Sequence, residues 1–346
     1  MNLKNILTIA FLFGGLMFIQ SCGDDEIDTP TVDTSALKAA VSQATDLIAT
    51  TSEGTGAGQY LLGSQDILQD AIDLAQDVLD NAASTQTVVD NATVAMNAAI
   101  AAYQANLVTP IDPGNLTGHW TFDDASGTTV ADFSGNNFTG TFGSEALFGG
   151  GSPAWTTDRY GNANKAISFD KGAKITVPYN ASLNPGLMSI SLWINATENR
   201  ENNRFMGLHS WEGFKFQLQS ANKAFFTGHT TEGIFDKDTD PPLELGTWYH
   251  VTVTIGDGNT TFYVNGVQTT KWEDTPGTMF PDSSHDLVFG VGSSKYAATT
   301  ENFDVDKIIP ADWGGYYNGA LDEVRIYKSV LSESQVSSIY AQERVQ

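Results

Sequence analysis

The chain of 346 residues contains a single cysteine, Cys22, which excludes a disulfide framework and any cysteine-rich zinc module. Positive charge is also scarce: 17 lysines and arginines against 41 aspartates and glutamates give a net charge of −24. Such a chain repels nucleic-acid phosphates and anionic lipid headgroups, so nucleic-acid binding and electrostatic adsorption to membranes are disfavoured. What the chain does have is 41% apolar residues, enough to bury a core, and a length that allows about two domains.

The N-terminus has the pattern of an export signal. Lys4 precedes the apolar run Ile6–Ile19, which is short for a bilayer span of roughly 20 residues, and Ile19-Gln20-Ser21-Cys22 follows at once. The segment resembles a bacterial lipoprotein signal peptide, which implies removal of residues 1–21 and lipidation of Cys22. An ordinary secretory peptide with an incidental cysteine is the alternative.

Residues 22–34 are predicted to be an acidic tether, and Asp24-Asp25-Glu26 lies near its start. This triplet resembles the surface-export tag of Bacteroidetes lipoproteins. The resemblance implies a protein anchored by lipid in a bacterial outer membrane and facing outward.

Residues 35–107 are rich in alanine, and their apolar residues recur at helical spacing. The pattern predicts three short helices, with Ser64 capping the second and Thr87 the third. The Ala-x-x-Leu/Ile of the first helix, Tyr60 and the final Ala99-Ile-x-x-Tyr103 resemble the FIVAR-type module of bacterial cell-surface proteins. A stalk is favoured for this module, and a partner-binding role is the alternative. Residues 108–115 contain Pro110 and Pro113 and are predicted to be a linker.

From residue 116 to 346, alternating and aromatic-rich segments recur between clusters of Gly, Asn and Asp, which predicts a two-sheet sandwich. Asn265-Gly266 predicts a tight hairpin. Ser332 and Gln335 predict a capping box at the start of a terminal helix over residues 332–342.

The order of motifs in this segment is specific for one fold. It runs Trp120-Thr-Phe-Asp123, Asp132-Phe-Ser-Gly-Asn136, Gly161-Asn-Ala-Asn-Lys-Ala-Ile-Ser-Phe169, Ser189-Ile-Ser-Leu-Trp193, Gly246-Thr-Trp-Tyr-His-Val251, Phe262-Tyr-Val-Asn-Gly266 and Gly319-Ala-Leu-Asp-Glu-Val-Arg-Ile-Tyr327. The set resembles the LamG-like jelly roll of the concanavalin A-like lectin and glucanase superfamily. The expected fold class is therefore a small all-α three-helix bundle followed by an all-β jelly-roll sandwich. The superfamily includes lectins, glycanases and adhesive repeats, so the fold does not decide the function.

A catalytic site is not predicted. Glycanases need two carboxylates about 5 to 9.5 Å apart, and glucanases of this family supply them from Glu-x-Asp-x-Glu on a strand, which this sequence lacks. Asp304-Val-Asp306 and Asp236-Lys-Asp-Thr-Asp240 come closest, but both lie among residues typical of turns. No Gly-x-Ser-x-Gly motif occurs either.

The same resemblance implies a structural calcium ion, because relatives of this fold often carry one that bridges their first and last strands. Carried over to this chain, the ligands would be Asp123, Asp132 and Asp322. Calcium prefers hard oxygen ligands such as these carboxylates. The alternative is that the aspartates only cap turns.

A sugar surface is predicted from aromatic residues in polar, loop-like surroundings, because sugar rings present apolar faces beside their hydroxyls. Trp211, Trp272, Trp313 and Tyr316 are the predicted stacking platforms, and Arg204 and Asp312 the predicted hydroxyl partners.

The favoured function is that of a lipid-anchored lectin-like protein that captures polysaccharide without cleaving it, beside a glycan-uptake complex on the same surface. Two alternatives remain open. One is a glycoside hydrolase or lyase with an unrecognised carboxylate pair, and the other is an adhesion or scaffold protein that binds another surface protein.

Overall fold

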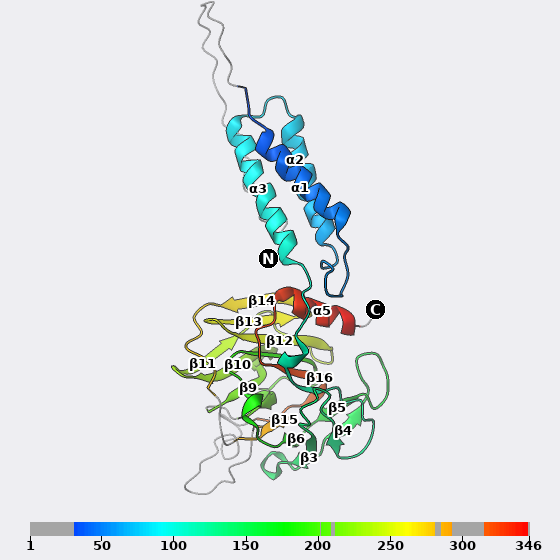
Figure 1. The fold of residues 1–346 in the computed structure, drawn as a ribbon. Coiled ribbons are helices and arrows are strands. Elements are labelled where there is room, and N and C mark those ends of the chain that lie inside the picture. The colour runs from blue at the N-terminus through cyan, green and yellow to red at the C-terminus, as the bar shows by residue number, and fades with distance from the viewer. Residues whose placement is uncertain (1–30, 201, 209–211, 281–284, 293–314, 345–346) are drawn as a thin grey trace, which may run out of the picture.

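The computed structural model describes residues 31–200, 202–208, 212–280, 285–292 and 315–344. A helical module leads into a β-sandwich, and a helix near the C-terminus lies between the two (Figure 1). The predicted fold class, a three-helix bundle followed by a jelly-roll sandwich, is confirmed. Among the described helices, none has both the length and the apolar character needed to cross a bilayer.

The helical module consists of α1 (Ser35–Thr50), α2 (Ser64–Asp80) and α3 (Gln86–Ala105). Buried residues at helical spacing give it a core of its own, which includes Leu37, Leu68, Ile72, Met96 and Tyr103. The sequence predicts all three helices correctly because an apolar stripe with a period of 3.6 residues can be buried only in this way.

Both predicted caps in this module are wrong. Ser64 is the first residue of α2 and not its cap. The side chain of Glu53 does the capping, because its Oε1 accepts from the Gln65 amide at 2.6 Å and from Ser64 Oγ at 3.2 Å. Thr85 caps α3 in place of Thr87 and accepts from the Val88 amide.

Two antiparallel sheets form the sandwich. Sheet I has the order β14 (Val267–Trp272), β13 (Asn259–Val264), β12 (Tyr249–Gly256), β7 (Met188–Ala196), β16 (Gly319–Tyr327), β5 (Ala166–Phe169) and β4 (Ala154–Thr156), with β1 (Leu116–Trp120) also paired to β16. Sheet II has the order β11 (Gly233–Asp238), β10 (Lys223–Thr230), β9 (Phe214–Gln219), β8 (Asn203–Gly207), β15 (Leu287–Phe289), β6 (Ala173–Val177), β3 (Gly140–Ser144) and β2 (Thr129–Val130). The predicted hairpin joins β13 to β14, with Asn265 and Gly266 both at positive φ.

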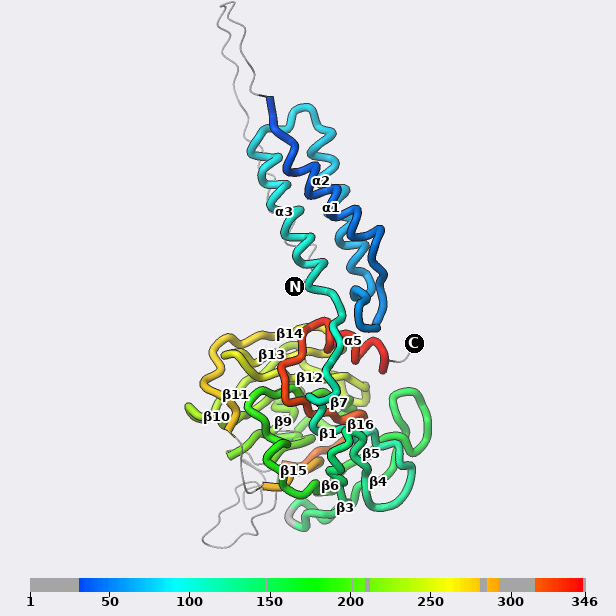
Figure 2. Tube along the Cα trace, in the orientation of Figure 1, coloured from blue at the N-terminus to red at the C-terminus, as the bar shows by residue number. Residues whose placement is uncertain are grey.

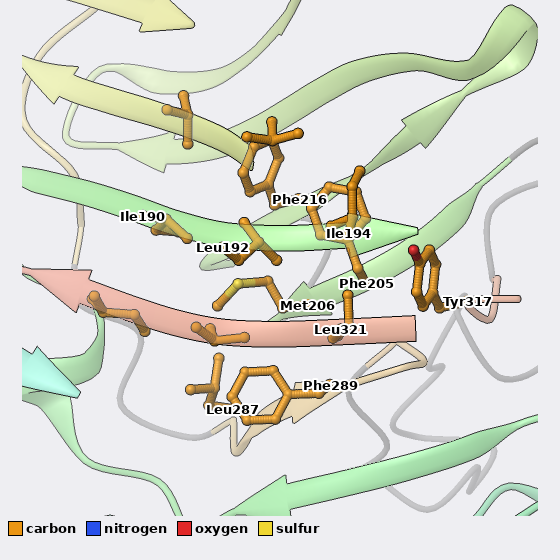
Figure 3. Packing of buried hydrophobic residues seen from close by; sticks show 14 of the residues in the cluster. Ile190, Leu192, Ile194, Phe205, Met206, Phe216, Leu287, Phe289, Tyr317 and Leu321 are labelled. Carbon is orange, nitrogen blue, oxygen red and sulfur yellow. The ribbon is translucent and has the colours of Figure 1, made fainter. Parts of the chain in front are cut away.

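The core of the sandwich lies between the inner faces of the two sheets. Ile190, Leu192 and Ile194 of β7 meet Phe205, Met206 and Phe216 from sheet II (Figure 3). Because successive side chains of a strand alternate in direction, every second residue faces away from the core, except at the bulge of β8, where Phe205 and Met206 both enter it. The outer face of each sheet is therefore available for contact with another layer of the protein or with a ligand.

The outer face of sheet I is covered by the terminal helix α5 (Glu333–Glu343), which begins with the predicted capping box of Ser332 and Gln335. Tyr340 of α5 stacks on Trp193 of β7 with ring centroids 5.8 Å apart. The helical module lies on the side of α5 that faces away from the sandwich (Figure 2). The outer face of sheet II is thus the one that points away from the helical module.

Candidate ligand-binding face

The outer face of sheet II is built from polar residues that alternate with core residues. On β9, Phe214, Phe216 and Leu218 enter the core, so Lys215 and Gln217 face outward. Both are nevertheless buried, with 5% and 0% of their surface exposed. Buried polar side chains of this kind are positioned by hydrogen bonds, which makes the face rigid.

Strand register aligns the outward residues into two rows across four strands. The first row is Arg204, Gln217, Phe225 and Asp238, and the second is Gly207, Lys215, Thr227 and Asp236, both in the order β8, β9, β10, β11. Adjacent strands lie about 4.8 Å apart, so each row is about 14 Å long. We call these two rows the polar floor.

Hydrogen bonds fix the polar floor. Arg204 Nε donates to Gln217 Oε1 at 3.4 Å, and Gln217 Nε2 donates to Asn202 Oδ1 at 3.0 Å and Gln219 Oε1 at 2.6 Å. Thr227 Oγ1 donates to Asp236 Oδ1 at 2.5 Å. Arg204 and Lys215 have further contacts within the chain. The central side chains are therefore fixed in place before any ligand arrives.

The accessible part of the face lies along β10 and β11. Asp236 is exposed and Phe225 is half-buried. Next to them, the ring of His229 lies 5.6 Å from that of Phe280, which is 47% exposed, and Ile234 is 48% exposed. We call Phe225, His229, Ile234 and Phe280 the aromatic margin. It offers the combination of apolar surface and neighbouring polar groups that suits a sugar ring.

The opposite margin lies beside β15 and β6. Arg200 lies over the ring of Tyr316, with Cζ 3.6 Å from the centroid, and Tyr316 packs against Phe148. Lys174 of β6 pairs with Glu145 at 3.3 Å. This side of the face therefore combines a half-buried aromatic ring with charged groups.

Residues 169–337 match the Laminin_G_3 family. The description of that family is the concanavalin A-like lectin/glucanases superfamily, and the matched residues include both rows of the polar floor. No match was found among curated proteins.

Several solved structures are similar to this chain over about two thirds of its length. Domain 4 of AbnA, a GH43 extracellular arabinanase from Geobacillus stearothermophilus solved with arabinotriose, is 20% identical, with 65% of this chain and 98% of that chain covered and a TM-score of 0.49. The binding domain of Paraclostridial Mosquitocidal Protein 1 is 18% identical, with 66% and 52% covered and a TM-score of 0.47. A structure of botulinum neurotoxin type C is 14% identical, with 67% and 52% covered and a TM-score of 0.46. The chain spans about half the length of the last two, and these likenesses concern the fold alone.

The predicted sugar-binding residues have different surroundings. Arg204 belongs to the polar floor, and Tyr316 lies at the margin beside β15. Trp272 lies on β14 of the other sheet, where its Nε1 donates to the carbonyl of Asp238 at 2.9 Å and its ring packs against the core. Trp211, Asp312 and Trp313 lie outside the described residues, as does Cys22.

The three predicted calcium ligands do not form one cluster in the described residues, although Asp123 lies near enough to Asp322 to raise the pKa of its carboxyl. Asp132 accepts from the amides of His119, Ser134 and Phe138 and from the hydroxyl of Ser134, so both of its oxygens organise a turn. Asp123 pairs with Lys165 at 3.4 Å.

Asp322, the third predicted ligand, is in contact with the guanidinium of Arg159, and burial raises the pKa of its carboxyl to about 8. In the part of the chain that the structure describes, no group of three or more acidic, His or Cys side chains is arranged to hold a metal ion. As arranged, the predicted ligands do not fit a calcium site.

The expectation that Asp236 and Asp238 lie among turn residues is wrong. Asp236 and Asp238 do not lie in a turn, because residues 233–238 form β11, and both carboxylates point to the outer face of sheet II. Residues two apart on a strand lie roughly 6.6 Å apart, which is a spacing that glycosidases use. Asp304 and Asp306 lie outside the described residues.

Sequence reasoning missed most of the polar floor. The signal was present in Phe214-Lys-Phe-Gln-Leu218, where charged and amide side chains alternate with core residues. Alternation of this kind reveals which residues share a face. It does not reveal that Arg204, Phe225 and Asp236 from three other strands join the same rows, because that depends on long-range register.

Proposed function

We propose that the protein is a lipid-anchored protein of the bacterial outer surface that captures polysaccharide on the outer face of sheet II without cleaving it. The observation that carries this proposal is the polar floor beside the aromatic margin. Asp236 and Asp238, at the accessible end of the polar floor, can accept hydrogen bonds from sugar hydroxyls, while Phe225 and Phe280 offer rings to the apolar faces of sugars. The match of residues 169–337 to a superfamily of lectins and glucanases supports a glycan as the ligand.

The arrangement of the layers supports display to the outside. From the helical module, the order is α5, sheet I, core and sheet II (Figure 1). The chain enters the module at the end remote from the sandwich, because the Asp33 amide donates to Gln86 Oε1 at the start of α3. A lipid on Cys22 would therefore place the membrane at the bundle end of the molecule, and the polar floor would face away from it.

Hydrolysis is the second candidate function, because Asp236 and Asp238 lie two residues apart on one strand, a spacing that glycosidases use. Two features favour binding instead. Asp236 is exposed and accepts a hydrogen bond from Thr227, and β11 is the edge strand of its sheet. Glycosidases surround their carboxylate pair with groups that desolvate and orient it, and an exposed carboxylate on an edge strand lacks such surroundings.

The test is retardation of the full chain in native gels cast with a panel of polysaccharides, with the same mixtures assayed for released sugar. We expect retardation without sugar release. The double variant Phe225→Ala/Phe280→Ala is expected to bind at least about tenfold more weakly, because truncation of an aromatic anchor residue costs about 2 kcal/mol or more and about 1.4 kcal/mol is a factor of ten.

Leu245→Ala provides the matched control, because Leu245 is 44% exposed but lies outside sheet II. Equal retardation of the double variant and the control would refute the assignment of the face. Release of sugar that Asp236→Asn abolishes would establish the hydrolase. No retardation by any polysaccharide would favour a protein partner instead.

A further inference from the structure

The terminal helix α5 has two contact surfaces. Its inner side presents Val336 and Ile339, which pack with Tyr263, Tyr327 and Leu331 on the outer side of sheet I. This apolar contact fixes the helix to the sandwich, because removal of such side chains from water is favourable.

The last turn of α5 is held separately. Arg159 Nε donates to the carbonyl of Glu343 at 2.7 Å, and the hydroxyl of Tyr160 donates to the same carbonyl. The Glu343 carboxylate in turn accepts from Trp193 Nε1 at 2.8 Å. Carbonyls at a helix end lack partners within the helix, so these donors prevent the end from fraying.

The outer side of α5 reaches the helical module. Ser338 Oγ donates to the carbonyl of Thr55, and Gln342 Nε2 donates to the same carbonyl at 3.0 Å. Gln335 Nε2 donates to the carbonyl of Pro110 at 3.2 Å. Three side chains on successive turns of α5 therefore bind backbone carbonyls of the loop between α1 and α2 and of the segment after α3.

That loop is itself tied to the segment after α3. The amide of Gly58 donates to the carbonyl of Val108, and the amide of Val108 donates to the carbonyl of Gln59, both at 2.8 Å. The ring of Tyr60 stacks on that of Tyr103 of α3 at 4.3 Å. The loop thus moves together with the bundle.

The segment predicted to be a linker is also attached along its length. Val108 is 4% exposed, and Ile111 and Leu116 pack against the apolar cluster beneath α5. A cavity of about 310 Å³ remains at the junction, between Val108, Arg325 and Gln342. The cavity is large enough to hold several water molecules. The polar contacts around it fix the geometry of the junction.

We propose that the outer side of α5 is an interaction surface whose partner is the chain's own helical module, and that the module and the sandwich form one rigid unit. The loop between α1 and α2 and residues 108–111 supply the carbonyls, and Gln335, Ser338 and Gln342 supply the donors. The direction of the polar floor relative to the bundle axis is then set by α5, and residues 108–115 do not act as a flexible tether.

The test is a distance measurement by pulsed electron spin resonance on the full chain. Nitroxides are attached at Ala82→Cys, in the exposed turn between α2 and α3, and at Val267→Cys, which replaces a side chain that is 63% exposed on β14. Cys22→Ser removes the native thiol. We expect one narrow distance distribution, and at least a twofold broadening in the triple variant Gln335→Glu/Ser338→Ala/Gln342→Ala, in which a carboxylate at position 335 still accepts from the Ser332 amide and keeps the capping box.

The matched control is Ser337→Ala, because Ser337 is on the same helix but lies beside Gly266 of the β13–β14 hairpin. It is expected to keep the narrow distribution. A broad distribution in the parent chain, or an equally narrow one in the triple variant, would overturn the proposal. Retardation by polysaccharide is expected to be unchanged in the triple variant, so failure of this inference and failure of the proposed function are separate results.

Discussion

His250 is a fully buried histidine on the outer face of sheet I, beneath α5. Its Nε2 lies 2.7 Å from Ser191 Oγ, and its ring lies 5.4 Å from that of Trp193 and 5.9 Å from that of Tyr340. Burial, assisted by the positive charges of Arg325 and Arg159, lowers its pKa to about 3. Serine and histidine together are typical of nucleophilic sites, but a pair with no exposed surface has no access to substrate, so a structural role is favoured.

The buried neutral His250 predicts acid lability. The folded-state pKa of about 3 lies below the ordinary value of 6.5, so its contribution to stability is complete above pH 6.5 and is lost as the pH falls toward 3. The free energy of unfolding should fall by up to about 1.4 kcal/mol per pH unit in this window. Urea denaturation at several pH values measures this slope. His250→Gln should flatten it, and an unchanged slope in this variant would contradict the assignment.

Residue identity alone does not reveal what an aspartate does in this fold. Asp132 organises a turn, Asp322 pairs with Arg159, and Asp236 faces outward from an edge strand. All three are aspartates, so residue type does not distinguish them. Their roles differ because burial and neighbours from distant segments decide them, and those depend on strand pairings between residues far apart in the chain.

At the scale of elements, the predictions that are confirmed depend on local periodicity. The three helices of the module, the hairpin at Asn265-Gly266 and the capping box at Ser332 depend on local spacing, and all are confirmed. The cap of α2 could not be predicted in this way. Its acceptor is Glu53, eleven residues before Ser64 and brought there by the folded loop.

Glu53 is expected to stabilise the helical module through this cap. Glu53→Ala removes the acceptor of the Gln65 amide and should lower the free energy of unfolding of the module by about 1 kcal/mol. Urea denaturation followed by circular dichroism at the helical band measures the change. Asp70→Ala is the control, because Asp70 is exposed on α2 and its removal changes the net charge equally. Equal stability of the two variants would show that the contact contributes nothing.

At the scale of the whole molecule, the proposed function assigns the bundle the role of a spacer. Its longest helix, α3, has 20 residues and therefore spans about 30 Å. The chain enters at the remote end of the bundle, and the polar floor lies beyond both α5 and sheet I. With the proposed anchor at Cys22, a ligand as large as a polysaccharide could then approach the floor without contact with the membrane.

This geometry predicts that anchoring and binding are separable. Cys22→Ser, expressed in the native bacterium, should move the protein from the membrane pellet to the soluble fraction, because each CH₂ of an acyl chain contributes about 0.8 kcal/mol to membrane binding and the variant has none. Retardation of the released protein by polysaccharide should equal that of the detergent-extracted parent chain. If the variant stays in the pellet, Cys22 is not the anchor. If it is released but no longer binds, the membrane itself contributes to the ligand site, and the separation of floor and anchor by α5 and the bundle is refuted.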